Sequence, residues 1–141
     1  MKASVFFHFE DLTFSLENKR KIREWLEGCC VKENKKLGDL NYIFCSDKYL
    51  LKVNRKHLNH NYLTDVITFD NTSPEGISGD IFISYERVKD NAKMYKQKSV
   101  DELHRIMIHG LLHLMGYSDK KAEQQKVMKS KEDFYLSLRG F

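Results

Sequence analysis

Proline is nearly absent from this chain, and long apolar runs are missing altogether. The 141 residues contain one proline, and no Gly/Ser-rich linker or internal repeat interrupts them, so we expect one domain over residues 1–141. Apolar runs such as Val5-Phe6-Phe7 and Ile106-Met107-Ile108 are far shorter than the roughly 20 residues that a membrane-spanning helix needs. The N-terminus also lacks the pattern of a secretion signal, which predicts a cytoplasmic protein with no membrane partner.

Cysteine is scarce, and its count is odd. Cys29 and Cys30 are neighbours in a helical pattern, where a disulfide between them would be strained, so with Cys45 they are expected to be buried free thiols. The net charge of +4, from 24 basic and 20 acidic side chains, is a mild excess. Such an excess assists binding to a polyanion such as nucleic acid without establishing it.

Segments rich in β-branched and aromatic residues predict four strands. A turn that contains Pro74 and Gly76 separates the last two, which we therefore expect to pair antiparallel. The predicted strands are residues 3–10, 41–46, 65–70 and 79–84.

Apolar residues at helical spacing predict five helices. Ser46 or Asp47 is expected to cap the second, and Ser99 with Glu102 matches a capping box at the start of the fourth. The predicted helices are residues 16–35, 47–57, 85–98, 99–116 and 120–138.

The fourth predicted helix is apolar on most sides and should lie centrally. The last one should bury Phe134, Tyr135 and Leu138. This order of elements predicts a small α+β domain, in which a mixed four-stranded sheet is covered by about five helices and the central helix carries a metal site.

The metal site is predicted from residues 109–119. His109 and His113 are four residues apart, so on a helix their imidazoles point the same way. Gly116 can adopt the left-handed conformation that ends the helix and lets Asp119 reach the same ion. Two imidazoles and one carboxylate leave one tetrahedral position open for water, as in a catalytic zinc site with one ion. The alternative is a hydrogen-bonded histidine pair without metal.

Gly110 separates this pattern from the long zinc-protease motif H-E-x-x-H-x-x-G-x-x-H. Those proteases place at this position the glutamate that takes a proton from the metal-bound water. A peptidase would therefore need a base from elsewhere, which makes that function the less favoured one.

Three motifs together resemble the bacterial YbeY family of ribosomal RNA maturation factors. They are residues 109–119, Leu63-Thr64-Asp65-Val66-Ile67-Thr68-Phe69 and Gly79-Asp80-Ile81-Phe82-Ile83-Ser84, which are similar to the family's H-G-x-L-H-L-x-G-Y-D-H, T-D-V-L-S-F and G-D-I-x-I-S. The resemblance implies a zinc-dependent, single-strand-specific endoribonuclease that acts in maturation of the 3′ end of 16S ribosomal RNA and in ribosome quality control. It also implies the small ribosomal subunit and ribosome-associated proteins as partners.

The chain departs from the family at two places. Asp119 stands where the family usually has a third histidine, and its negative charge should make bound water somewhat less acidic. Leu58 stands where most members carry an arginine thought to act on substrate. Arg55, or His60 as a proton donor or phosphate contact, is a candidate to replace it.

Other polar residues near the motifs have two possible roles each. Asp80 is a candidate to orient a ligand or water, or is a turn residue. Thr64 and Asp65 either hydrogen-bond near the cleft or stabilise a turn, and Tyr117 either stacks on a base or packs. His8, His57 and His104 are expected to be structural or surface residues.

Hydrolysis of RNA phosphodiesters is the leading function that the sequence predicts, with His109 and His113 acting through metal-bound water. Attack by that water and attack by the RNA's own 2′-hydroxyl both stay open. The alternatives are a zinc peptidase or amidase and a non-catalytic RNA- or ribosome-binding protein with a structural metal.

Overall fold

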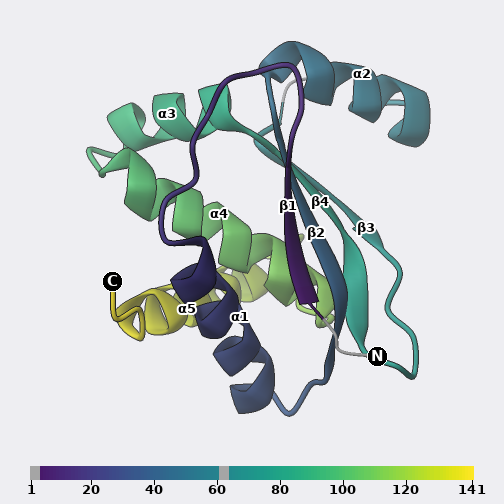
Figure 1. Ribbon diagram of the computed structural model, residues 1–141, viewed down its shortest axis with the longest axis vertical. Helices are drawn as coiled ribbons and strands as arrows, with labels where there is room; N and C mark the ends of the chain where they lie inside the picture. Colours follow the sequence, from purple (N-terminus) through teal and green to yellow (C-terminus); the bar gives the residue numbers. More distant parts are fainter. Residues whose placement is uncertain (1–3, 61–63) are drawn as a thin grey trace.

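The computed structural model describes residues 4–60 and 64–141, and in them it places four strands and five helices (Figure 1). The predicted α+β domain with a mixed sheet is confirmed. Ala3 and Leu63, which belong to a predicted strand and a motif, lie outside the described residues. The elements are β1 (Ser4–Phe9), α1 (Lys19–Lys32), β2 (Leu37–Cys45), α2 (Asp47–Leu58), β3 (Val66–Asp70), β4 (Ile77–Ser84), α3 (Tyr85–Met94), α4 (Ser99–Leu114) and α5 (Ala122–Ser137).

The sheet has the strand order β1-β2-β4-β3. β1, β2 and β4 run parallel, and β3 runs antiparallel to β4 with Val66 opposite Ile83 and Asp70 opposite Gly79. The antiparallel pairing predicted from the Pro74 turn is therefore confirmed. None of the helices in the described part of the chain has the length and apolar character needed to cross a bilayer.

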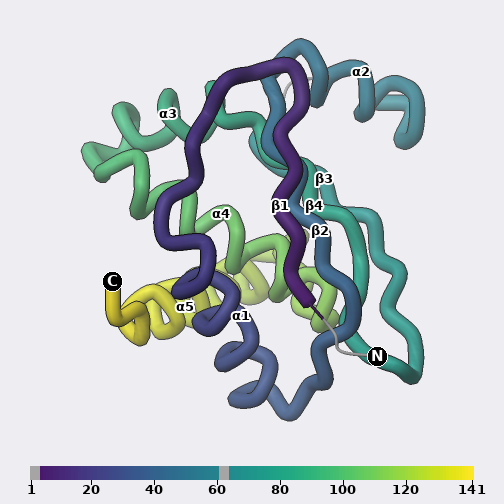
Figure 2. The backbone as a smooth tube through the Cα atoms, in the orientation of Figure 1, coloured from purple at the N-terminus to yellow at the C-terminus, as the bar shows by residue number. Residues whose placement is uncertain are grey.

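The two faces of the sheet are covered unequally. Residues of α1, α4 and α5 build the larger core on one face, together with alternate residues of β1, β2 and β4 such as Val5, Leu40 and Ile81. On the other face α2 packs through Leu50 and Val53 in a smaller cluster (Figure 1). Residues 10–18 connect β1 to α1 by a long path, which Figure 2 shows running past the α3–α4 region.

α4 lies close against β4 because each element places a glycine opposite a branched side chain of the other. A Cβ atom added to Gly110 would meet Ile81 Cγ2 at 2.8 Å, and one added to Gly79 would lie 3.2 Å from the methyl groups of Leu114. Gly110 is buried, so the helix surface that faces the sheet is backbone at this point. The close approach fixes the height of α4 above the sheet, and thereby the position of the two histidines that flank Gly110.

The two predicted helix caps differ in outcome: the cap of α2 is confirmed and the capping box of α4 is not. Ser46 does cap α2, since its Oγ accepts a hydrogen bond from the Tyr49 amide at 3.1 Å. The capping box at Ser99 is wrong: Lys98 occupies the N-cap position without a side-chain cap, and Ser99 is already helical. Glu102 is buried instead of reaching back to the helix start, and Asn91 donates a hydrogen bond to it.

The buried side of α5 also differs from the prediction. Tyr135 is buried, but Phe134 and Leu138 are 48% and 43% exposed. The helix buries Met128 and Glu132 in their place. All three cysteines are buried free thiols, as predicted, and burial raises the pKa of Cys29 and Cys45 to about 12 and that of Cys30 to about 11.

Candidate metal centre

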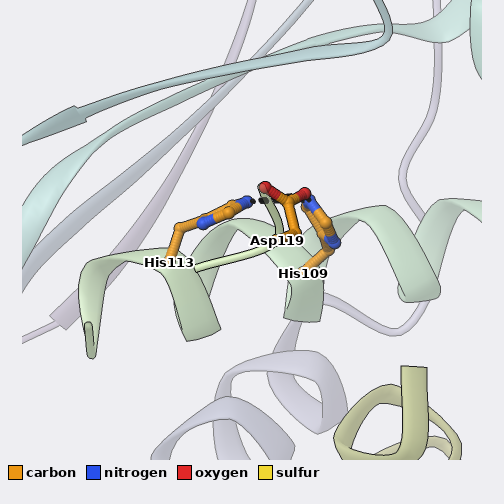
Figure 3. Close-up of side chains that lie close together, drawn as sticks. All are labelled: His109, His113 and Asp119. Atoms are coloured by element: carbon orange, nitrogen blue, oxygen red, sulfur yellow. Dashed lines mark hydrogen bonds and ion pairs between the residues drawn. The ribbon is translucent and has the colours of Figure 1, made fainter. Parts of the chain in front are cut away.

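His109 and His113 lie one turn apart in the second half of α4 and point to the same side (Figure 3). Both side chains are partly buried, with exposed fractions of 21% and 24%. Their Nε2 atoms are 3.0 Å apart. The spacing of four residues therefore brings both imidazoles to one point, as the sequence predicted.

Asp119 reaches this point from the segment that follows the helix. Gly116 has φ +105°, which turns the chain back after α4 ends. The Asp119 Oδ2 atom lies 3.4 Å from His109 Nε2 and 3.3 Å from His113 Nε2. Ligands held by zinc at about 2.0–2.1 Å in a tetrahedron lie roughly 3.3 Å from one another. The three atoms thus have the separations that a tetrahedral zinc site requires, and among residues 4–60 and 64–141 no fourth ligand joins them.

The other nitrogen of each imidazole has a partner of its own. Nδ1 of His109 is 2.6 Å from Glu132 Oε2, and Nδ1 of His113 is 2.9 Å from the backbone carbonyl oxygen of Tyr117. Both partners accept hydrogen bonds, so both Nδ1 atoms carry the proton and both Nε2 lone pairs are directed at the shared point. This donor set, two neutral imidazoles and a carboxylate, suits zinc.

Glu132 is a residue of this centre that the sequence did not reveal. It lies on α5 and is 7% exposed, and its second oxygen accepts a hydrogen bond from Arg105 Nη1 at 2.8 Å. Arg105 also contacts Asp133, at 2.5 Å. A buried carboxylate on a charged helix has no local signal that separates it from surface glutamates, since its partner is on another helix.

Glu33, in the C-cap position of α1, is a second residue that the sequence did not reveal. Its carboxylate accepts hydrogen bonds from the Tyr117 hydroxyl at 2.5 Å, from Lys131 Nζ at 3.1 Å and from the Tyr135 hydroxyl. Burial favours the protonated acid, but these three donors outweigh it and hold the pKa of Glu33 below its ordinary value. Tyr117 is thus held at its hydroxyl by Glu33, while its carbonyl orients His113, so it packs in the structure as a positioning residue.

Acidic groups surround His109. Burial acts to lower the pKa of His109, but the hydrogen bond and charge of Glu132, with smaller contributions from Asp119 and Asp65, raise it above its ordinary value. Burial raises the pKa of Asp65, which accepts a hydrogen bond from Asn91 Nδ2 at 3.1 Å. These acidic groups therefore favour a positive charge beside the His109 ring, which a metal ion would supply while the imidazole itself stays neutral.

Asp80 is not brought to this centre. Strand alternation places the side chain of Ile81 against Gly110 of α4, so Asp80 faces the other side of the sheet. There it lines a shallow hollow with His8, Asn41 and Phe82. A role for Asp80 in orienting a ligand imidazole has no support in this geometry.

The candidates for the missing arginine lie around the end of α2. Arg55 is in the last turn of α2, and His60 lies two residues after the helix ends at Leu58. Both residues are exposed. Among the described residues, the group that can hold a metal consists of His109, His113 and Asp119, and His60 is outside it. Roles for Arg55 and His60 in substrate contact stay predictions.

The remaining histidines lie in different surroundings. His8 is exposed, with its Nε2 2.8 Å from Asn41 Oδ1, and His57 packs edge-on against Phe69. His104 is buried on α4 between Trp25 and Phe141. Thr64 makes a local hydrogen bond to the carbonyl of Val66 at 3.5 Å, as in a turn.

The chain is similar to one protein family, to individual members of that family and to a solved structure. The family described as endoribonuclease YbeY matches residues 7–139. A protein of Cytophaga hutchinsonii named endoribonuclease YbeY is 52% identical over 141 residues, which are 99% of this chain and 99% of that protein. One of the same name from Flavobacterium johnsoniae is 49% identical over 132 residues, which are 94% of each chain. The solution structure of a Thermotoga maritima protein is similar with a TM-score of 0.63 and 25% identity, over 94% of this chain and 87% of that one.

Proposed function

Because the chain belongs to the endoribonuclease YbeY family, we propose that it is a zinc-dependent endoribonuclease for single-stranded RNA that matures the 3′ end of 16S ribosomal RNA and serves ribosome quality control. Family membership makes it a nuclease, a hydrolase of RNA phosphodiester bonds. We further propose that residues 1–141 act as one hydrolase domain in the cytoplasm, with the small ribosomal subunit as partner.

The convergence of three ligand atoms supports the metal part of this proposal. His109 Nε2, His113 Nε2 and Asp119 Oδ2 lie 3.0–3.4 Å apart, and Glu132 and the Tyr117 carbonyl hold the two imidazoles in the ligating tautomer. The chemistry that bound zinc supplies is Lewis-acid polarisation of a phosphoryl oxygen and acidification of water. His109, His113 and Asp119 would hold the ion, and the scissile phosphate would bind beside them, next to the Asp119 carboxylate.

Gly110 weighs against the peptidase alternative. Zinc proteases with this helical motif carry their glutamate base at this position. Here the position faces Ile81 at a distance that leaves no room for a side chain. Asp80 has a carboxylate that could replace that base, but it lies on the opposite face of the sheet. We therefore propose RNA and not peptide as the substrate.

The deciding experiment compares wild type with His113→Ala, Asp119→Ala and the control His57→Ala, which changes an exposed histidine of α2. Each protein is loaded with zinc, its metal content is measured, and it is incubated with single-stranded RNA, duplex RNA and unfolded casein. Wild type and His57→Ala are expected to hold one zinc ion and cleave only the single-stranded RNA. The other two variants are expected to lose about 100-fold or more of both zinc affinity and cleavage rate, because each removes one of three ligands.

Each other outcome has a definite meaning. Equal cleavage by wild type, His113→Ala and Asp119→Ala would refute the metal-dependent mechanism. Cleavage of casein without RNA would favour the peptidase, and tight zinc with RNA bound but uncut would favour the non-catalytic protein. Product ends separate the two chemical routes, since a 2′,3′-cyclic phosphate indicates attack by the 2′-hydroxyl. Small subunits that carry 3′-extended ribosomal RNA, added as substrate, test the biological target.

A further inference from the structure

A hollow of about 540 Å³ opens from the metal centre into the groove between α4 and α5. Its inner end is formed by His109 and Asp119, and its outer end by Tyr95 and Gln97 in the connection between α3 and α4. The volume is within the range of small-molecule sites, roughly 300–1,000 Å³. The groove therefore has room for a ligand group attached to whatever lies at the metal.

Helical spacing explains the walls of this hollow. Glu102, Arg105 and His109 are three and four residues apart, so they share one face of α4. Gln125, Lys129 and Glu132 form the facing side of α5 in the same way, with Met128 buried between them. Polar side chains thus line both walls.

The charges in the hollow favour a neutral ligand group. The guanidinium of Arg105 is already paired with Glu132 and Asp133, at 2.8 and 2.5 Å. Lys129 is the other cation of the lining, and the carboxylates of Glu102 and Glu132 oppose it. A second phosphate placed here would face these carboxylates without a free pair of cations, whereas a nucleobase carries no charge.

The outer end has the chemistry that recognises a base. Tyr95 is 59% exposed, so the face of its ring is available for stacking. Lys96 has φ +55°, and this left-handed residue reverses the chain between Tyr95 and Gln97, which both line the hollow. The side-chain amide of Gln125 makes no hydrogen bond within residues 4–60 and 64–141, so both its donor and its acceptor are available to a ligand.

We propose that this hollow is a nucleobase subsite: one base of the single-stranded RNA next to the cleaved phosphodiester stacks on Tyr95 and hydrogen-bonds to Gln97 and Gln125. The inference rests on the proposed ribonuclease function and deepens it. A base can enter this groove only if it is unpaired, which gives a physical reason for selecting single strands.

The test measures binding of a fluorescent, non-cleavable 2′-O-methyl oligonucleotide to the full zinc-loaded chain by anisotropy, together with KM and kcat on the matching RNA. Tyr95→Ala is expected to weaken binding and raise KM about tenfold, because stacking of one base contributes about 1–3 kcal/mol. Tyr95→Phe keeps the ring, and Phe134→Ala removes an exposed aromatic of α5 outside the hollow. Both controls should stay within about twofold of wild type.

An abasic nucleotide moved along the oligonucleotide locates the base. Wild type should lose affinity strongly at one position, and Tyr95→Ala should not. If wild type cleaves RNA while Tyr95→Ala binds and cleaves as wild type does, the base subsite is refuted although the proposed function stands. If Lys129→Ala, and not Tyr95→Ala, weakens binding and lowers its salt dependence, the hollow takes a phosphate and the proposal is also refuted. If wild type neither binds nor cleaves RNA, the proposed function itself fails.

Discussion

Three histidines of α4 lie in three different environments. His109 is oriented by a charged group, the buried carboxylate of Glu132 on α5. His113, one turn later, is oriented by a neutral group, the backbone carbonyl of Tyr117. His104, toward the start of the helix, lies among aromatic rings and is 2.7 Å from the guanidinium of Arg139.

The surroundings, and not the helix, thus decide what each histidine does. A carboxylate makes an imidazole a stronger ligand, a carbonyl only fixes its tautomer, and a cation with apolar neighbours keeps it neutral. Because α5 supplies Glu132 and α1 supplies the Glu33 anchor of Tyr117, two separate helices hold the two ligands of α4. The difference between them can be tested one group at a time.

Removing Glu132, the charged group that orients His109, should have the largest effect on zinc affinity. Glu132→Ala deletes the acceptor of the His109 Nδ1 proton, and zinc affinity is expected to fall about 10–100-fold. Glu132→Gln keeps a carbonyl acceptor and should lose only a few-fold. A chromophoric chelator that competes for zinc gives the affinities.

Asp133→Asn is the matched control for Glu132. It removes the other partner of Arg105 but leaves the contact between Glu132 and His109 intact, so zinc affinity should stay within about twofold of wild type. Equal losses in Asp133→Asn and Glu132→Ala would show that the Arg105 ion pairs, and not orientation of His109, carry the effect.

His104 should make the fold sensitive to acid. Burial, with the Arg139 charge, lowers the pKa of His104 to about 4. Above pH 6.5, the ordinary pKa of histidine in the unfolded chain, His104 is neutral in both states. As the pH falls from about 6.5 toward 4, only the unfolded chain takes up the proton. The free energy of unfolding therefore decreases by about 2–3 kcal/mol over this range. His104→Gln, which retains an acceptor for Arg139, should lack this part of the pH dependence in urea unfolding. The histidine has no such role if wild type and His104→Gln lose stability in parallel between pH 6.5 and 4.

Loosening Tyr117, whose neutral carbonyl orients His113, should have the smallest effect on zinc affinity. Tyr117→Phe removes the hydroxyl bonded to Glu33 but keeps the carbonyl that accepts from His113. We expect about 1 kcal/mol less stability and a few-fold lower zinc affinity. Tyr95→Phe removes an exposed hydroxyl and should change neither quantity. If Tyr117→Phe lowers zinc affinity as much as Glu132→Ala does, the charged and the neutral partner do not differ in their effect on the metal centre.

The sequence predicted the parts of the site that are local. The spacing of His109 and His113 and the turn at Gly116 are short-range features, and the structure brings both histidines to one point with Asp119. The role of Glu132 could not be predicted from the sequence, because Glu132 is 23 residues from His109 and meets it only through the packing of α5 against α4.

Asp80 and Ser99 show two further limits of local pattern. Strand periodicity cannot tell which face of β4 meets α4, because a shift of one residue reverses every side chain. At Ser99 the capping-box pattern was present, but Glu102 is buried near Asn91 and Asp65, so tertiary contacts displaced the local hydrogen bond.

The close approach at Gly110 also limits how this metal centre can be re-engineered. Grafting a protease-like base by Gly110→Glu alone would drive the new Cβ atom into Ile81, 2.8 Å away, and push α4 with both of its ligands off the sheet. A designer would have to shorten Ile81 at the same time, and the added side chain would still lie between helix and strand instead of beside the ion. Conversion to a peptidase is therefore a problem of rebuilding a helix–sheet contact, not of exchanging one catalytic residue.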